Sequence, residues 1–284
     1  MPPIDVVILT RGDRPAALAA AIASVRAQRG VQAHVIVVWN GVPVAPDADP
    51  WARHLTTEEN LGIPAGRNLG AAATTAPVVM FLDDDAALQG EDLLATAAAR
   101  FAADPRLAVI SPRIVDEHGV TAQRHVPRVG RRGVDRGGPV AGFLGGVAIM
   151  RRCAFDDVGG YEGRLFYAME ESDLAWRLVD RGWSIAYAPE LVVFHPHTDP
   201  TRHPDAIRRT ARNRVWIVHR SLPLPLAIGH LATWFVIEAL RRPRTLGLVV
   251  EGYRLGWRTR IGPRRPIRWR TVARLTRLGR PPVV

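Results

Sequence analysis

Three consecutive carboxylates, Asp83, Asp84 and Asp85, directly follow a short apolar run, Val78–Leu82. A valine-rich apolar run of this length, bounded by turn residues, predicts a buried strand. Carboxylates crowded at a strand end repel one another, so their ionised forms need a positive partner. Mg²⁺ and Mn²⁺ prefer oxygen ligands and often join carboxylates to a substrate phosphate. A solvated acidic loop would look the same, but the buried strand favours a divalent metal site.

His195 could complete such a site, since it follows another predicted strand and imidazole is a common metal ligand. A histidine in this place is more often structural, however. Polar and basic side chains suited to a nucleotide lie in two further stretches, ILTRGDRP and NLGIPAGRN. Arginine there can pair with phosphate or stack on a base. The residues concerned are Thr10, Arg11, Arg14, Arg67 and Asn68.

A second acidic cluster has the sequence MEESDLAWR and includes Glu170, Glu171 and Asp173. These residues lie in the first turn of a predicted helix, Met169–Gly182, where the helix dipole favours negative charge. Capping alone would therefore explain the cluster. Neighbouring acids also raise the pKa of a carboxyl group, which suits a general base.

The elements that must position these residues alternate between strand and helix in the first half of the chain. The predicted strands are Asp5–Thr10, Ala33–Trp39, His54–Thr57 and Val78–Leu82, and the predicted helices are Pro15–Gln28, Pro64–Ala73 and Glu91–Ala103. This alternation predicts an α/β fold with a mostly parallel central sheet and helices on both faces. Ligands bind beyond the carboxyl ends of the strands in such sheets, where the aspartates stand.

The second half of the chain is less regular. A stretch rich in Gly and Arg, Val126–Pro139, predicts a mobile loop. Strands are predicted at Gly142–Arg152, Ser184–Ala188 and Leu191–Phe194, and the pattern from about Asp205 onward is helical.

The net charge of +11 over 284 residues is unevenly distributed. Residues 1–200 contain 19 Arg and 24 Asp plus Glu, a net charge of −5, whereas residues 201–284 contain 19 Arg and three acids, a net charge of +16. Such a basic segment favours an anionic partner: nucleic acid, lipid headgroups or an acidic substrate. The single cysteine, Cys153, excludes an intrachain disulfide and favours a reducing compartment. We expect a cytoplasmic protein whose opening MPPIDVVILT is a strand rather than a signal peptide.

Six features in order resemble family 2 glycosyltransferases, and most closely their rhamnosyltransferase-like branch, which builds bacterial polysaccharide and glycolipid. They are ILTRGDRP, NLGIPAGRNLG, FLDDD, GFLGGVAIMRR, MEESDLAWR and the strand-end His195. The resemblance runs from Asp5 to about Thr198. It implies one Rossmann-like nucleotide-sugar-binding domain of the GT-A fold at residues 1–204, followed by a helical, Arg-rich C-terminal region at residues 205–284.

The resemblance also implies roles for single residues. Glu171 would be the catalytic base, one methylene longer than the family's usual aspartate, with Glu170 and Asp173 beside it. Asp85, with Asp83 and His195, would hold a divalent cation, Mg²⁺ or Mn²⁺. The residues implied for the nucleotide sugar are Thr10, Arg11, Arg14, Asn40, Arg67, Asp83 and Asp84. Gly145 and Gly146 would leave room for the donor sugar or the acceptor.

The chain departs from many relatives after its second predicted strand, where VVWNG replaces an aspartate that touches the base. Trp39 could stack on the base and Asn40 could hydrogen-bond to it. The departure leaves uridine and thymidine diphosphates open as donors.

The implied activity is an inverting transfer of a sugar from a UDP- or dTDP-sugar to an acceptor hydroxyl. The metal would stabilise the departing diphosphate while Glu171 removes the proton. The acceptor would be a glycan or glycolipid at the inner face of a membrane, or alternatively a soluble small molecule.

Three interpretations of the basic C-terminal region stay open. The apolar stretch Leu222–Arg242 is too interrupted for a good spanning helix, and with its Arg-rich neighbours it suits a membrane surface. The same helices could pack on the catalytic domain or on a second copy in a homo-oligomer. A nucleic-acid-binding protein is the alternative from another class, but no zinc-ligand spacing or RNA-recognition motif supports it, and we expect no nucleic-acid partner.

Overall fold

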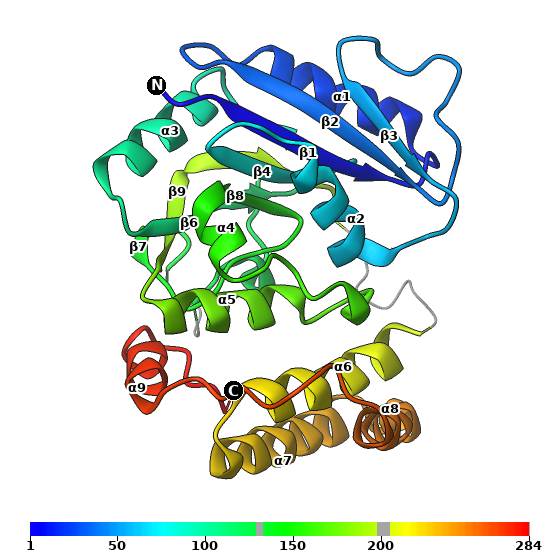
Figure 1. Cartoon of the computed structure of the whole chain (residues 1–284), viewed down its shortest axis with the longest axis vertical. Coiled ribbons are helices and arrows are strands. Elements are labelled where there is room, and N and C mark those ends of the chain that lie inside the picture. Colours follow the sequence, from blue (N-terminus) through cyan, green and yellow to red (C-terminus); the bar gives the residue numbers. More distant parts are fainter. Residues whose placement is uncertain (129–132, 198–204, 284) are drawn as a thin grey trace.

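The computed structural model describes residues 1–128, 133–197 and 205–283 and contains one large β-sheet with helices on both faces (Figure 1). The strand order is β3-β2-β1-β4-β8-β6-β9-β5, with β7 beside β9. The strands are β1 Ile4–Thr10, β2 Ala33–Asn40, β3 Arg53–Thr57, β4 Val78–Asp83, β5 Ala87–Leu88, β6 Leu107–Val115, β7 Gly138–Pro139, β8 Val147–Arg151 and β9 Ser184–Phe194. Strands β1 to β4, β6 and β9 run in one direction, opposite to β5, β7 and β8, which confirms the mostly parallel α/β sheet.

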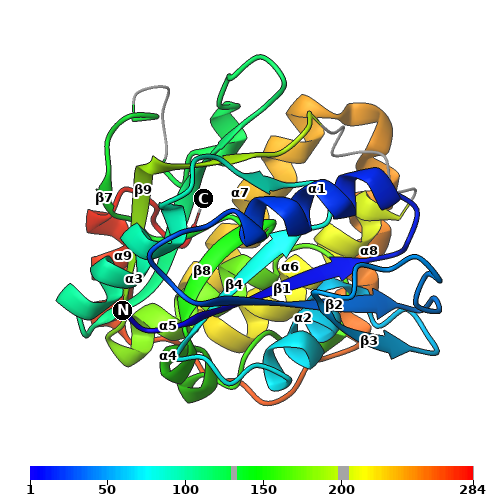
Figure 2. The same cartoon turned by 90° about the horizontal axis from the view of Figure 1, so that it is seen from above.

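The helices cover both faces of this sheet. They are α1 Pro15–Arg26, α2 Gly62–Ala72, α3 Leu93–Ala103, α4 Arg152–Asp157, α5 Glu170–Arg181, α6 Ala206–Ser221, α7 Leu224–Arg241, α8 Leu246–Arg258 and α9 Trp269–Arg277. In Figure 2 the sheet runs between α1 on one side and α2 and α4 on the other. Alternate residues of β1 separate accordingly: Val6 and Ile8 belong to the core beneath α1 and α3, and Val7 belongs to the core on the opposite face.

The sequence prediction differs from the structure at five strands. Strands β5, β6 and β7 were not expected, and β7 lies at the end of the stretch predicted as a mobile loop. Strand β6 pairs with β8 and in parallel with β9. Its sequence contains Pro112, which cannot donate a ladder hydrogen bond, and the register with β9 shifts there. Residues 184–188 and 191–194 form one strand rather than two. Residues 142–146 lie outside β8, which leaves this Gly-rich segment free to turn.

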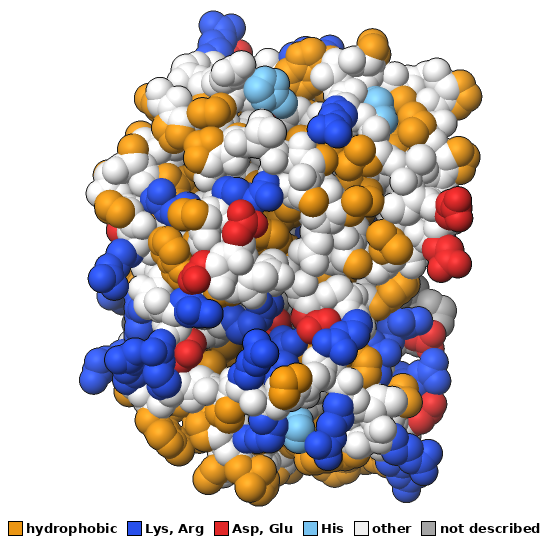
Figure 3. Space-filling model, viewed as in Figure 1, with side chains coloured by type: hydrophobic (Ala, Val, Ile, Leu, Met, Phe, Trp, Pro, Cys, Tyr) orange, Lys and Arg blue, Asp and Glu red, His pale blue; other side chains and the backbone are white. Residues whose placement is uncertain are grey.

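The C-terminal helices form a layer below α5 in Figure 1 and belong to the same hydrophobic core as the sheet. Val215 and Ile217 of α6 and Leu231 of α7 join the cluster that contains Phe81 of β4. Arg side chains gather over this lower half of the molecule in Figure 3. The helices therefore pack on the rest of the chain. The predicted boundary at residue 204 falls in residues 198–204, and part of the predicted loop falls in residues 129–132; both lie outside the described residues.

Candidate functional site

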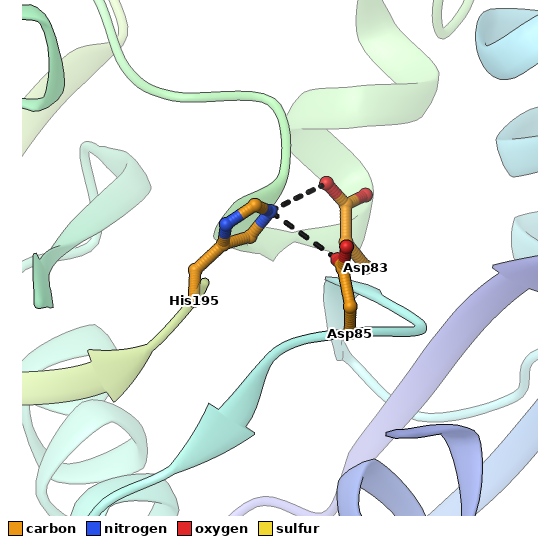
Figure 4. Close-up of side chains that lie close together, drawn as sticks. All are labelled: Asp83, Asp85 and His195. Atoms are coloured by element: carbon orange, nitrogen blue, oxygen red, sulfur yellow. Dashed lines mark ion pairs between the residues drawn. The ribbon is translucent and has the colours of Figure 1, made fainter. Parts of the chain in front are cut away.

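Two aspartates and a histidine converge where β4 and β9 end. Asp83 is the last residue of β4, Asp85 lies in the following turn, and His195 directly follows β9 (Figure 4). His195 Nε2 lies 3.6 Å from Asp83 Oδ2 and 3.3 Å from Asp85 Oδ1. One ligand atom from each of the three lies within 4.8 Å of the others. The set of two carboxylates and an imidazole suits Mg²⁺ or Mn²⁺.

Arginines balance the charge of these aspartates. Arg14 pairs with Asp85 and, at 2.7 Å, with Asp84. Arg67, which is 3% exposed, donates to Asp83 at 2.8 Å. Burial disfavours the charged form of Asp83, but His195 and Arg67 outweigh it and hold the pKa of that carboxyl below its usual range.

Asp84 is the exception, because burial raises its pKa although Thr10 donates to it at 2.7 Å. The carboxylates therefore already have cationic partners in the protein itself.

A pocket of about 580 Å³ opens beside this carboxylate cluster, within the usual size range of small-molecule sites. Six of the residues implied for the nucleotide sugar line it: Thr10, Arg11, Arg14, Asn40, Asp83 and Asp84. Arg67, on α2, does not line the pocket, but it contacts the carboxylate cluster by donating a hydrogen bond to Asp83. The wall also includes Phe166 and Tyr167, and Asp205 and Arg209 from the C-terminal region. We refer to this cavity as the donor pocket.

Trp39 does not face the donor pocket, so it cannot stack on a base there. It is 4% exposed, and its indole N–H donates to His54 Nδ1 at 3.1 Å. Asn40 does line the pocket, but its amide holds the chain before α2. It donates to Asn60 Oδ1 at 2.9 Å and accepts from the Leu61 N–H at 2.8 Å. This segment forms part of the pocket wall, so Asn40 shapes the pocket.

Glu170 and Glu171 lie together at the start of α5. Burial, and then the charge of Glu171, raise the pKa of Glu170 to about 8. Burial also raises the pKa of Glu171, which Arg67 opposes. A side chain at residue 145 would overlap the Glu171 carboxylate, and one at residue 146 would crowd Asp83. Gly145 and Gly146 therefore make room for the two acids of the site, and their predicted role towards the sugar stays a prediction.

Asp173, in the first turn of α5, is fully buried. Arg177 donates to its Oδ2 at 2.7 Å, and Arg220 of α6 donates to its Oδ1. Asp173 does not line the donor pocket. Both oxygens have cationic partners, so the geometry favours a structural role.

A segment in an unusual conformation connects the donor pocket to α5. Phe166, Ala168 and Met169 have φ values of 63°, 68° and 74°, which residues with a side chain rarely adopt. Asn213 of α6, fully buried, donates to the carbonyl oxygens of Leu165 at 2.9 Å and of Ala168 at 2.9 Å. Asn213 was not among the residues predicted for the site. The sequence signal for it is an asparagine inside a predicted helix, where its helix propensity is poor.

The sequence and fold of this chain are similar to those of known glycosyltransferases. Residues 5–159 match the family model for glycosyl transferase family 2. A pre-mycofactocin glycosyltransferase from Mycobacterium tuberculosis is 30% identical over 238 residues, which is 74% of this chain and 48% of that protein. An N-acetylglucosaminyl-diphospho-decaprenol L-rhamnosyltransferase from the same species is 34% identical over 96 residues, 34% of this chain and 29% of that protein. The chain thus spans less than half the length of these curated relatives.

The fold has similar solved structures. The mannosyltransferase PcManGT from Pyrobaculum calidifontis, in complex with GDP-Man and Mn²⁺, superposes with a TM-score of 0.60 at 18% identity, covering 90% of this chain and 87% of that one. This likeness confirms the GT-A fold. The family model spans more than half of the chain and includes β1 to β4 with their aspartates, so this protein is a member of glycosyl transferase family 2.

Proposed function

We propose that this protein is an inverting, metal-dependent enzyme that transfers a sugar from a UDP- or dTDP-sugar to an acceptor hydroxyl in polysaccharide or glycolipid biosynthesis. The observation that carries the proposal is the convergence of Asp83, Asp85 and His195 at the carboxyl ends of β4 and β9. Two of these residues belong to the carboxylate cluster beside a pocket of nucleotide-sugar size.

Asp83, Asp85 and His195 would hold Mg²⁺ or Mn²⁺, because their oxygen and nitrogen atoms form a suitable ligand set. A bound cation would supply charge stabilisation to a departing diphosphate. The fold relative PcManGT was solved with Mn²⁺ and GDP-Man, which supports metal dependence. Arg14 and Arg11 line the donor pocket and would contact the phosphates.

Glu171 would act as the base. Its raised pKa brings the carboxylate closer to the working pH, where proton transfer is most effective, while Arg67 favours its ionised form. Glu171 would accept the acceptor's hydroxyl proton. The acceptor oxygen would then bond to the anomeric carbon as the bond from that carbon to the diphosphate oxygen breaks, with the electron pair leaving on the diphosphate. A single displacement of this kind inverts the anomeric centre.

We further propose that the enzyme works at an anionic membrane surface. Among the described residues, α7 is the one helix whose length and composition would allow it to cross a membrane, and only 11% of it is buried. Its exposed apolar residues recur every four positions at Leu224, Ile228, Val236 and Leu240, with Ala232 between them. The helix also carries His230 and Glu238, which suits a surface position better than a spanning one. The lipid-linked acceptor named for one relative supports this location.

A panel of nucleotide sugars tests the catalytic proposal. Purified protein is incubated with UDP-, dTDP- and GDP-sugars in Mn²⁺ or Mg²⁺, and donor hydrolysis and nucleotide binding are measured. We expect binding and slow hydrolysis for at least one uridine or thymidine donor, both lost in excess chelator. Equal nucleotide binding with and without chelator would refute metal dependence. Preference for a guanosine donor would refute the proposal that the donor carries uridine or thymidine.

A further inference from the structure

A second cavity has Glu171 in its wall, and no family motif accounts for most of the residues that line it. It has a volume of about 140 Å³. Glu171, Ser172 and Trp176 of α5 form one side, and Met169 and Phe143 lie beside them. Six further residues of the wall come from the C-terminal region: Arg214, His230, Trp234, Arg280, Pro281 and Pro282. We call this cavity the tail pocket.

The tail pocket contains hydrogen-bonding atoms that have no partner among the described residues. His230 is 3% exposed, and its Nε2 is buried without a partner, as is the indole Nε1 of Trp234. Such atoms are rare in folded proteins and call for an explanation. His230 Nδ1 lies 2.6 Å from the carbonyl oxygen of Pro282, which can only accept, so Nδ1 carries the proton.

A neutral His230 therefore presents a lone pair at Nε2, while Trp234 presents an N–H. Burial supports the neutral form, lowering the pKa of His230 to about 4. A hydroxyl group both donates and accepts, so a polyhydroxylated ligand would satisfy both atoms once a small movement of the pocket side chains uncovers them, since both are buried. Trp176 and Trp234 also line the pocket and add apolar surface to its wall.

Two guanidinium groups give the pocket its charge. Arg214 is 6% exposed and lies 3.8 Å above the ring of Trp234, and no carboxylate within ion-pair distance is found for it in the described part of the chain. Arg280 approaches Gly142 and the Glu171 side of the pocket. Arg280 is exposed and has Glu171 nearby, but Arg214 is a buried cation without such a partner, which is costly, so the pocket favours a ligand that brings negative charge.

We infer that the tail pocket binds the acceptor, and that this acceptor is a hydroxylated molecule with an anionic group, phosphate or carboxylate, near the hydroxyl that is glycosylated. This inference rests on the proposed function, because Glu171 is the base only in that function. Arg280, Arg214, His230 and Trp234 are then residues that determine acceptor specificity.

The eight tryptophans allow a direct test of binding. Protein labelled with ¹⁵N at the indole nitrogens is titrated with glucose 1-phosphate, glucuronate and uncharged glucose, and the Trp234 signal is assigned by its loss in Trp234→Phe. We expect the two charged probes to shift the Trp234 signal, because its N–H gains an acceptor, and glucose to bind at least tenfold more weakly. The exposed Trp269 of α9 should not respond.

Arg280→Gln should weaken binding of the charged probes about tenfold, the usual scale for a lost charge-assisted hydrogen bond. The matched control is Arg277→Gln, an exposed arginine three residues earlier, which should bind like the wild type. Phosphatidylinositol in detergent micelles, a lipid whose headgroup carries hydroxyls beside a phosphate, is compared with glucose 1-phosphate. Saturation at a lower concentration of the lipid indicates a lipid-linked acceptor, and the reverse order indicates a soluble one.

Two results would overturn the inference: a Trp234 signal that no charged probe moves in the millimolar range, or equal affinity of wild type and Arg280→Gln. Nucleotide binding is measured in the same samples. If donors fail to bind while the charged probes still shift Trp234, the proposed function fails and the anion site stands.

Discussion

Asp85 and His195 are 110 positions apart in the sequence, yet their side chains approach within 3.3 Å because β4 and β9 end at the same edge of the sheet. Asp85→Ala should abolish transfer and weaken nucleotide binding, since a cation held at this site loses a carboxylate ligand. Activity and nucleotide affinity are measured with Mn²⁺. Asp47→Ala, which removes an exposed acid, is the control. Full activity of Asp85→Ala would show that Asp85 does not hold an essential metal.

Glu171 is the carboxylate that lines the tail pocket. Glu171→Gln should keep donor binding but lower turnover by about 100-fold or more, the scale of general base catalysis. In the wild type, turnover should fall as the pH drops through the raised pKa of Glu171, because the protonated form cannot accept a proton. Asp173→Asn should instead reduce stability, since Arg177 loses its charged partner and Arg220 keeps only Glu162. A variant Glu171→Gln that still turns over normally would rule Glu171 out as the base.

Glu170 makes stability depend on pH, because its folded-state pKa of about 8 lies above its ordinary value of 4.5. Below pH 4.5 the group is protonated in both the folded and the unfolded state. Between the two values only the unfolded state loses the proton, so the free energy of unfolding falls as the pH rises. Glu170→Gln should therefore raise stability by at least about 1 kcal/mol above pH 8, with no gain near pH 4.5. Urea unfolding at several pH values checks this, and a gain that is the same at every pH would contradict it.

At the residue scale, the sequence identified most of the groups that meet at the donor pocket, because strand-end positions follow directly from the strand pattern. Trp39 was misplaced. Its side chain position depends on which face of β2 it occupies, and both faces of a buried strand are apolar. Arg280 and His230 could not be found this way, since their place near Glu171 is set by the packing of helices distant in sequence.

At the scale of elements, α6 holds the segment that leads into α5. Residues in the left-handed region cost about 1–3 kcal/mol each, so three of them between residues 166 and 169 need external support. Asn213 supplies it through hydrogen bonds to the Leu165, Tyr167 and Ala168 carbonyl groups.

Asn213→Ala should lower turnover at least tenfold and raise the nucleotide KM, because Tyr167 lines the donor pocket and Glu171 follows the segment. Circular dichroism and thermal unfolding establish that the variant is folded. The control is Asn68→Ala. The sequence suggested Asn68 for the nucleotide, but its amide bonds to the backbone of Tyr161 and it does not line the donor pocket, so this variant should affect stability more than the nucleotide KM. An unchanged KM and turnover in folded Asn213→Ala would show that the segment supports itself.

The regular alternation of strands and helices up to α3 was predictable because each element there has its own apolar period. Strand β6 and the single long β9 were not, since Pro112 and Pro189 interrupt their patterns and only the pairing between them keeps both extended.

At the scale of the whole molecule, the positive charge of the C-terminal region lies on one side. Arg side chains gather over the layer that contains α7 (Figure 3). Each basic residue near anionic lipid contributes about 1 kcal/mol, and apolar residues that enter the interface add to this. The intact protein should therefore sediment with anionic liposomes, less so at high salt, and much less with neutral ones.

The paired substitution Ile228→Glu and Leu240→Glu on the exposed face of α7 should reduce liposome binding at least tenfold, whereas Val44→Glu, in a loop between β2 and β3, should not. Binding of duplex DNA in place of lipid, unaffected by the two glutamates, would point to nucleic acid as the partner of the basic surface.

Residues 280 to 282 and Glu171 line the tail pocket together, so this pocket cannot form until the ribosome has translated residue 282. The described wall of the donor pocket is complete in sequence by Arg209, whereas the tail pocket must wait for Pro282. At about 5–20 residues per second, translation of the intervening helices takes on the order of ten seconds. A nascent chain therefore has the residues that we propose hold a nucleotide before it has those that we propose select the molecule to be glycosylated.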